Sequence, residues 1–178
     1  MADIILGSGK LYMLAYDAED GIPTNEALEV AGNEIGTVKG GASVTYKPTT
    51  YSVTDDFGRI LKSFVTSEEV TLKSGVITFD MQVLANLSGA AAYSATTTAK
   101  TVKIGGRGAN GLQAYIIRFV HTMASGLKLR CTIVGSNEEG LSFAFAPDKE
   151  TQIDVTWKAM PSDTDGTLVI FEEELAGA

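Results

Sequence analysis

The C-terminal segment 152–174 most constrains the fold, because it is patterned as two strands joined by a polar turn. Its first half alternates strictly, with Ile153, Val155, Trp157 and Ala159 on one side and Asp154, Thr156 and Lys158 on the other. The Asp-rich turn 161–166 ends in Asp-Gly, which is a strong hairpin signal. The second strand, 168–171, is apolar on both faces and must be covered on both. We therefore expect a helix or a neighbouring subunit to cover its second face.

Length and composition indicate one globular domain over residues 1–178. No apolar run approaches the ~20 residues of a membrane span, and residues 1–10 lack the basic region of a signal peptide. The single cysteine, Cys131, excludes an internal disulfide. It lies on the apolar side of a strand pattern, which predicts a small buried hydrophobic side chain.

The formal net charge of −8 argues against a surface that grips nucleic acid, since such a surface needs clustered Lys and Arg. Two explanations of the negative charge remain open at this point. It can serve solubility alone, or it can belong to a surface that must not bind DNA.

Strand patterns dominate the chain, and regular turns between them indicate a β-sandwich or barrel of about nine strands. A long polar loop is expected over 17–33, and further loops over 52–58 and 89–100. The expected strands are 10–16, 34–38, 42–51, 59–73, 101–104, 112–122, 127–134 and 141–146, followed by the C-terminal hairpin. The strand 112–122 is apolar on both faces, like 168–171.

One helix is expected, between residues 74 and 87. Ile77, Met81, Leu84 and Leu87 share a face at spacings of three and four. Ser74 is the expected N-cap, and Gly89 is expected to end the helix.

Three segments resemble ligand-binding motifs, but the residues around each do not fit such a site. The Gly-Ser-Gly-Lys at 7–10 lacks the earlier glycine of a phosphate loop and has Leu11 where Ser or Thr would hold magnesium. The glycine-rich 106–111 precedes a strand pattern instead of the helix that a dinucleotide site needs. Asp163–Gly166 resembles a calcium loop, but a hairpin turn explains it better.

The sequence offers little for catalysis. His121 is the only histidine, and it stands at the end of a strand pattern, where histidine is usually structural. No pair of carboxylates stands in a context typical of acid–base chemistry. We expect no enzyme activity, no cofactor and no metal.

The order of elements resembles that of the tail tube proteins of long-tailed bacteriophages and related phage-tail-like particles. Segment 35–47, Ile-Gly-Thr-Val-Lys-Gly-Gly-Ala-Ser-Val-Thr-Tyr-Lys, is similar to the part of those proteins that leads into their ring-forming strands. Segment 155–161, Val-Thr-Trp-Lys-Ala-Met-Pro, with its Asp/Gly turn, is similar to their closing hairpin. The resemblance covers most of the chain, but 89–100 matches no feature of the family.

The resemblance implies a mainly β fold of tail-tube type, a β-sandwich or barrel with one flanking helix, whose long strands join across subunits into a hexameric ring. It implies stacked rings that form a tube in the virion tail, assembled in the host cytoplasm, through which DNA passes without specific binding. The implied partners are further copies of the chain, a tape measure protein, and tail terminator or baseplate proteins, with no membrane contact.

The resemblance also assigns candidate residues. Ser43, Thr45, Lys47 and Ser63, on the two long strands, are candidates to line the channel. Lys10, Asp55, Asp56 and Arg59 are candidates for ring stacking, together with the arm 1–9 and the loop 52–58. Ile116, Phe119, Val169 and Phe171 are candidates for packing between subunits.

Three alternatives remain open. The same fold serves the tube of a contractile injection or secretion machine. A carbohydrate-binding β-sandwich is a second alternative, although the only tryptophan, Trp157, stands in an alternating apolar row instead of an exposed aromatic platform. A decoration protein or a pilus component is the third.

Overall fold

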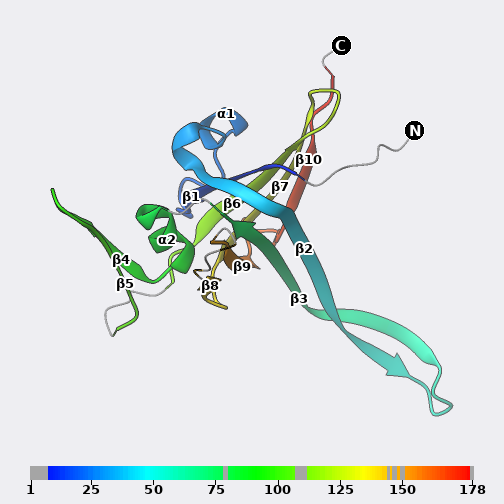
Figure 1. Ribbon diagram of the computed structural model, residues 1–178. Coiled ribbons are helices and arrows are strands. Elements are labelled where there is room, and N and C mark those ends of the chain that lie inside the picture. Colours follow the sequence, from blue (N-terminus) through cyan, green and yellow to red (C-terminus); the bar gives the residue numbers. More distant parts are fainter. Residues whose placement is uncertain are drawn as a thin grey trace.

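The computed structural model describes residues 8–77, 80–106, 112–143, 145, 148 and 151–176. Figure 1 shows a central group of strands from which two hairpins project. The elements in chain order are β1 (Lys10–Ala15), α1 (Asn25–Leu28), the 3-10 helix η1 (Ala31–Asn33), β2 (Glu34–Thr54), β3 (Ile60–Val76), α2 (Met81–Ser88), β4 (Ala91–Ala95), β5 (Lys100–Ile104), β6 (Tyr115–Thr122), β7 (Lys128–Ser136), β8 (Leu141–Phe143), β9 (Ile153–Met160) and β10 (Ile170–Glu173).

The prediction of a mainly β fold is confirmed, and the main sheet closes into an antiparallel barrel. The strand order is β7-β6-β1-β2-β3-β9, and β9 pairs back onto β7 with Val134 opposite Met160. Gly135 makes this closure possible, since a Cβ at that position would lie 2.3 Å from the carbonyl oxygen of Lys158. β10 and β8 extend the sheet beyond the closed ring, along β7 and β9 respectively.

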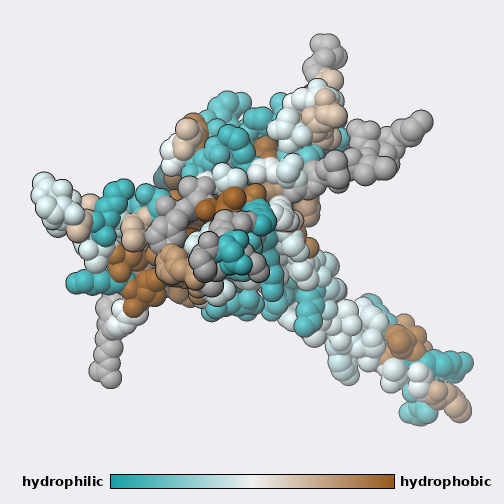
Figure 2. Space-filling model, in the orientation of Figure 1, coloured by the Kyte–Doolittle hydropathy of each residue, from teal (hydrophilic) through white to brown (hydrophobic). Residues whose placement is uncertain are grey.

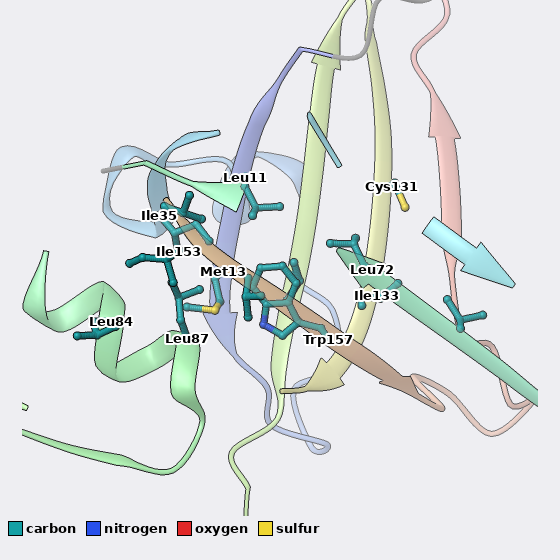
Figure 3. Packing of buried hydrophobic residues seen from close by; sticks show 14 residues of the cluster. Leu11, Met13, Ile35, Leu72, Leu84, Leu87, Cys131, Ile133, Ile153 and Trp157 are labelled. Atoms are coloured by element: carbon teal, nitrogen blue, oxygen red, sulfur yellow. The ribbon is translucent and has the colours of Figure 1, made fainter. Parts of the chain in front are cut away.

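The barrel core consists of side chains from alternating positions of the strands (Figure 3). Trp157 on β9 and Leu72 on β3 are opposite each other in register, and both are fully buried. Leu84 and Leu87 of α2 join the same cluster. Cys131 is buried as predicted, and burial raises the pKa of its thiol to about 11.

The C-terminal hairpin forms, but its second strand begins later than predicted. β10 starts at Ile170, and Leu168 and Val169 pack against the core from the preceding loop. The Asp163 carboxylate stabilises the turn, since it accepts hydrogen bonds from the backbone N–H of Asp165 and Thr167. The expectation of a core strand over 168–171 is therefore wrong in its boundaries.

The helix also begins later than predicted. Ser74 is not its N-cap, because it lies in β3, where its hydroxyl donates a 3.0 Å hydrogen bond to the carbonyl of Gly41. Asp80 is the N-cap, and its carboxylate accepts from the backbone N–H of Gln82 and Val83. Gly89 ends the helix in a left-handed conformation, φ 66°, as predicted.

Four further expectations are corrected. Strands 34–38 and 42–51 are one strand, because Gly40 and Gly41, both at positive φ, form a bulge within β2. The expected loop 52–58 is shorter than predicted, since β2 runs to Thr54 and only residues 55–58 form the turn. The expected loop 89–100 holds β4, which pairs with β5. The expected loop 17–33 holds α1 and η1, so the chain has more than the one predicted helix.

Smaller differences concern strand ends and the excluded motifs. Strand 112–122 begins at Tyr115, and strand 141–146 ends at Phe143 as an assigned strand, with residues 144 and 146 outside the described residues. Parts of three predicted features also lie outside the described residues. These are residues 107–111 of the glycine-rich motif, Gly7 of the phosphate-loop-like motif, and residues 1–7 of the predicted N-terminal arm 1–9.

Candidate assembly surface

The distal parts of β2 and β3, with the turn between them, form an arm that projects from the barrel (Figure 1). We call residues 45–69 the arm. Val70, at its base, is 1% exposed, whereas no residue of the arm is buried. Figure 2 shows apolar residues gathered near the far end of the projection. The exposed large apolar residues of the arm are Tyr46, Tyr51, Val53, Phe57, Ile60, Leu61, Phe64 and Val65.

The arm carries apolar side chains on both faces. Tyr51 is opposite Phe64 in register, and the Lys62 ammonium lies 4.8 Å from the centre of the Phe64 ring. Because side chains alternate along a strand, Thr50 and its partner Val65 lie on the other face. A two-stranded ribbon with two apolar faces has no core of its own, and exposed apolar surface of this kind is typical of interaction sites.

The strand edges of the arm are also open. β1 pairs with β2 only through Glu34–Thr37, and β9 pairs with β3 only through Thr71–Val76. Among the described residues, the outer edges of both strands along the arm therefore lack a strand partner. Such edges offer unpaired N–H and C=O groups to another chain.

Asp55 and Arg59 build the tip of the arm. The Asp55 carboxylate accepts from the backbone N–H of Phe57 and Arg59 at 3.0 and 2.8 Å, and from the Arg59 guanidinium at 2.7 Å. The backbone hydrogen bond from Arg59 is the main cause that lowers the pKa of Asp55. The guanidinium also lies 5.6 Å from the ring centre of Phe57, which is 85% exposed. The tip thus presents an aromatic ring beside a cation.

The four predicted ring-stacking residues lie in two places. Asp55, Asp56 and Arg59 are together at the tip of the arm. Lys10 lies on the barrel at the start of β1, where its ammonium is 2.8 Å from the Glu34 carboxylate, far from the tip (Figure 1). The structure therefore does not bring Lys10 together with the other three residues.

Three of the four predicted channel-lining residues share one face. Ser43, Thr45 and Lys47 alternate along β2 on the side opposite the core, and all are exposed. Their register partners on β3 are Lys73, Thr71 and Glu69, and β9 adds Thr156 and Lys158 on the same face. Along these residues, the outer face of β2, β3 and β9 is polar. Ser63 lies on the other face, where its hydroxyl is 2.8 Å from that of Ser52.

The four predicted subunit-packing residues differ in exposure. Ile116 is buried within the chain in a small cluster with Leu28 of α1. Phe119 and Val169 are partly buried and pack against the barrel core. Phe171, on β10, is 62% exposed. Of the four, Phe171 is the side chain most open to another molecule.

The sequence reasoning missed a buried ionic cluster beneath α1. Glu29 follows α1, and its carboxylate accepts from Arg130 at 2.5 Å and from Lys128 at 2.7 Å, with Arg118 at 3.5 Å. Burial alone would raise the pKa of Glu29, but the hydrogen bonds from Arg130 and Lys128 outweigh it, so this pKa is lowered. Arg130 also binds Glu172 on β10 at 2.8 Å. The cluster therefore ties α1, β7 and β10 together.

A signal for this cluster was present in the sequence. Arg118 stands between Ile116 and Val120 on one face of a strand that is apolar on both faces. A charged side chain in such a place needs a buried partner. The identity of that partner was not readable, because Glu29 is distant along the chain and lies in a segment expected to be loop.

No protein-family model matches the chain, and no curated protein is similar to it in sequence. Within the described ranges, no three His, Cys, Asp or Glu side chains are grouped to hold a metal ion. The helices described there are all too short or too polar to cross a membrane. The arm and the polar outer face of β2, β3 and β9 are thus the main candidates for a functional surface.

Proposed function

We propose that this chain is a structural subunit that assembles into stacked hexameric rings, forming the tail tube of a bacteriophage or phage-tail-like particle through which DNA passes. The arm carries the proposal. It extends two strands of the barrel into solvent with apolar side chains on both faces and with open edges. An isolated chain leaves this surface uncovered, whereas assembly with further copies covers it.

The sheet topology supports ring closure. Among the described residues, β2 from Gly40 onward pairs with no strand on its outer side, and β8 has β9 as its one neighbouring strand. Joining the β2 edge of one copy to the β8 edge of the next continues the sheet from copy to copy. A sheet that closes on itself in this way surrounds a channel and removes its own edges.

The outer face of the same layer is suited to line a channel for DNA. Ser43, Thr45, Thr71 and Thr156 are small and polar, and Lys47 is opposite Glu69. Each phosphate paired with an unopposed Lys or Arg would release counterions and add affinity, which would slow transit. Lys73 also lies on this face, opposite Ser43, so the wall carries mainly small hydroxyls and few cations, which in a chain of net charge −8 limits that affinity.

The proposal includes the partners that a tube of this kind needs. These are a tape measure protein that sets the length of the tube, and terminator or baseplate proteins at its ends. Assembly would take place in the host bacterial cytoplasm, and the product would be part of the virion tail. A tube of a contractile injection or secretion machine would use the same surfaces, so it differs only in what surrounds the tube.

A carbohydrate-binding module is the less supported alternative. Trp157 is fully buried in the barrel, so it cannot stack on a sugar ring. The exposed aromatic residues of the arm lie on a narrow projecting ribbon instead of a concave platform.

Electron microscopy combined with mass measurement of the purified protein tests the proposal. We expect rings, or tubes with an open lumen, and a ring mass of an integral multiple of 18.8 kDa, six for a hexamer. A chain that stays monomeric at high concentration, or that binds glycans without self-association, would contradict it.

A further inference from the structure

A second exposed apolar surface lies at β10, remote in sequence from the arm. Ile170, Phe171 and Leu175 are 37%, 62% and 80% exposed. β10 pairs with β7 on one side, and its other edge has no strand partner within the part of the chain that the structure describes. We call residues 170–175 the β10 edge.

The β10 edge is held firmly in place although it is short. Arg130 binds the Glu172 carboxylate at 2.8 Å, and the backbone N–H of Glu174 donates to the carbonyl of Lys128 at 2.9 Å. The Glu174 carboxylate accepts in turn from the backbone N–H of Lys128 at 3.1 Å. An edge fixed in this way is a preorganised template for a further strand, because little ordering remains to be done when the strand binds.

The charges of the β10 edge and of the arm are complementary. On β10, Glu173 is two residues from Phe171 and therefore shares its face, opposite the face of Glu172. On the arm, Lys62 lies over Phe64 and Arg59 lies over Phe57. The arm thus presents aromatic rings beside cations, and the β10 edge presents an aromatic ring beside a carboxylate.

We propose that the arm of one copy docks on the β10 edge of another copy, with the arm extending β10 as an additional strand and Lys62 close to Glu173. This inference rests on the proposed function and identifies the surface that receives the arm. β8 is the competing acceptor, since Phe143 and Phe145 are also exposed. Those two rings pack on each other in a T-shaped pair, with centroids 5.5 Å apart, and the β8 edge is the one that continues the sheet around the ring.

Photo-crosslinking in the assembled protein tests this docking. The substitution Phe57→p-benzoylphenylalanine keeps an aromatic side chain at the tip of the arm, and mixing ¹⁵N-labelled with unlabelled copies identifies crosslinks between chains. After trypsin digestion, we expect the probe on peptide 159–178, which follows Lys158 and contains the β10 edge. The same probe at Tyr93, on the β4–β5 hairpin, is the control and should not label that peptide.

A charge exchange provides a second test. Lys62→Glu and Glu173→Lys should each lower the yield of the crosslink between copies several-fold, and the double variant should recover it. Glu139→Lys, the same change at an exposed carboxylate near β8, should not restore the yield of Lys62→Glu.

The outcomes separate this inference from the proposed function. Assembled rings whose probe labels peptide 131–149, which contains β8, would overturn the docking on β10 and leave the ring intact. Failure of the double variant to recover would also overturn it. A protein that neither assembles nor crosslinks between copies would overturn both proposals.

Discussion

The two halves of the β2–β3 hairpin are formed by the same pair of strands, yet they have opposite surroundings. Near the barrel, Leu72 and Val70 are buried, and the opposite face of the strands is polar. Along the arm, Phe64 and Val65 lie on different faces, and both are exposed. One half has a single apolar face covered by its own chain, whereas the other half has two apolar faces that the described chain leaves open.

Under the proposed function, this difference separates residues that stabilise the fold from residues that serve association. In the barrel, removing apolar surface from water stabilises the monomer. In the arm, the same kind of side chain is exposed and has no such effect within the chain; the proposed association with another copy would bury it. Substitutions near the barrel should therefore change the stability of the monomer, whereas substitutions in the arm should change association.

The largest expected effect on stability comes from matched leucines on β3. Leu72→Ala should lower the free energy of unfolding by about 4 kcal/mol, because it opens a cavity beside Trp157. Leu61→Ala, on the exposed arm, should change it by less than about 0.5 kcal/mol. Urea unfolding of the monomer, followed by Trp157 fluorescence, measures both. Equal losses for the two variants would contradict the division between barrel and arm.

The second-largest effect on stability is expected from the buried ionic cluster around Glu29. Glu29→Gln leaves Arg130 and Lys128 without their shared carboxylate and should cost about 3 kcal/mol. Its matched control on the arm is Asp55→Asn, which removes an exposed pair and should change the stability of the monomer little.

The pH dependence of this effect has a defined sign. The pKa of Glu29 is lowered on folding, so its contribution is fully present above its ordinary value of 4.5 and is lost as the pH falls through the folded pKa. The stability difference between wild type and Glu29→Gln should therefore shrink below pH 4.5. A difference that grows on acidification would show that Glu29 is not bound as an anion.

Substitutions at two glycines separate the stability cost of a close contact from the cost of a strained backbone conformation. Gly135→Ala places a Cβ 2.3 Å from the Lys158 carbonyl oxygen, so it should disturb the β7–β9 closure and cost about 2 kcal/mol or more. Gly58→Ala meets open space at the tip of the arm, and its φ of 77° alone is strained, at about 1 kcal/mol. Thermal unfolding of the two variants ranks them. A larger loss for Gly58→Ala would indicate that the arm is part of the folded core.

The sequence predicted the barrel strands better than it predicted their surroundings. Alternation placed Trp157 and Cys131 in the core, because period-two patterning reports directly which face is buried. The same pattern wrongly predicts two strands separated at Gly40 and Gly41, because a pair of glycines is typical of a turn as well as of a bulge within one strand. The Ala/Ser/Thr-rich composition of β4 predicts a loop, because it carries no apolar pattern that would indicate a strand.

The candidate surface was predictable in part. The polar run Ser43, Thr45 and Lys47 was identified, because it alternates along one strand with the apolar positions of the core. The bulge at Thr66, where Thr49 pairs with Ser67 and Thr50 with Val65, shifts the alternation of β3, so Ser63 lies on the other face. Local spacing does not report such a shift, nor the pairing of Glu29 with residues distant along the chain.

We propose that the arm serves assembly and not folding. Sedimentation over a range of concentrations, comparing wild type with the double variant Tyr51→Ser/Phe64→Ser, tests it most directly. We predict that wild type forms rings or tubes, whereas the variant stays monomeric with an unchanged unfolding midpoint. A variant that assembles at the same concentration as wild type, or that loses stability as a monomer, would contradict the claim.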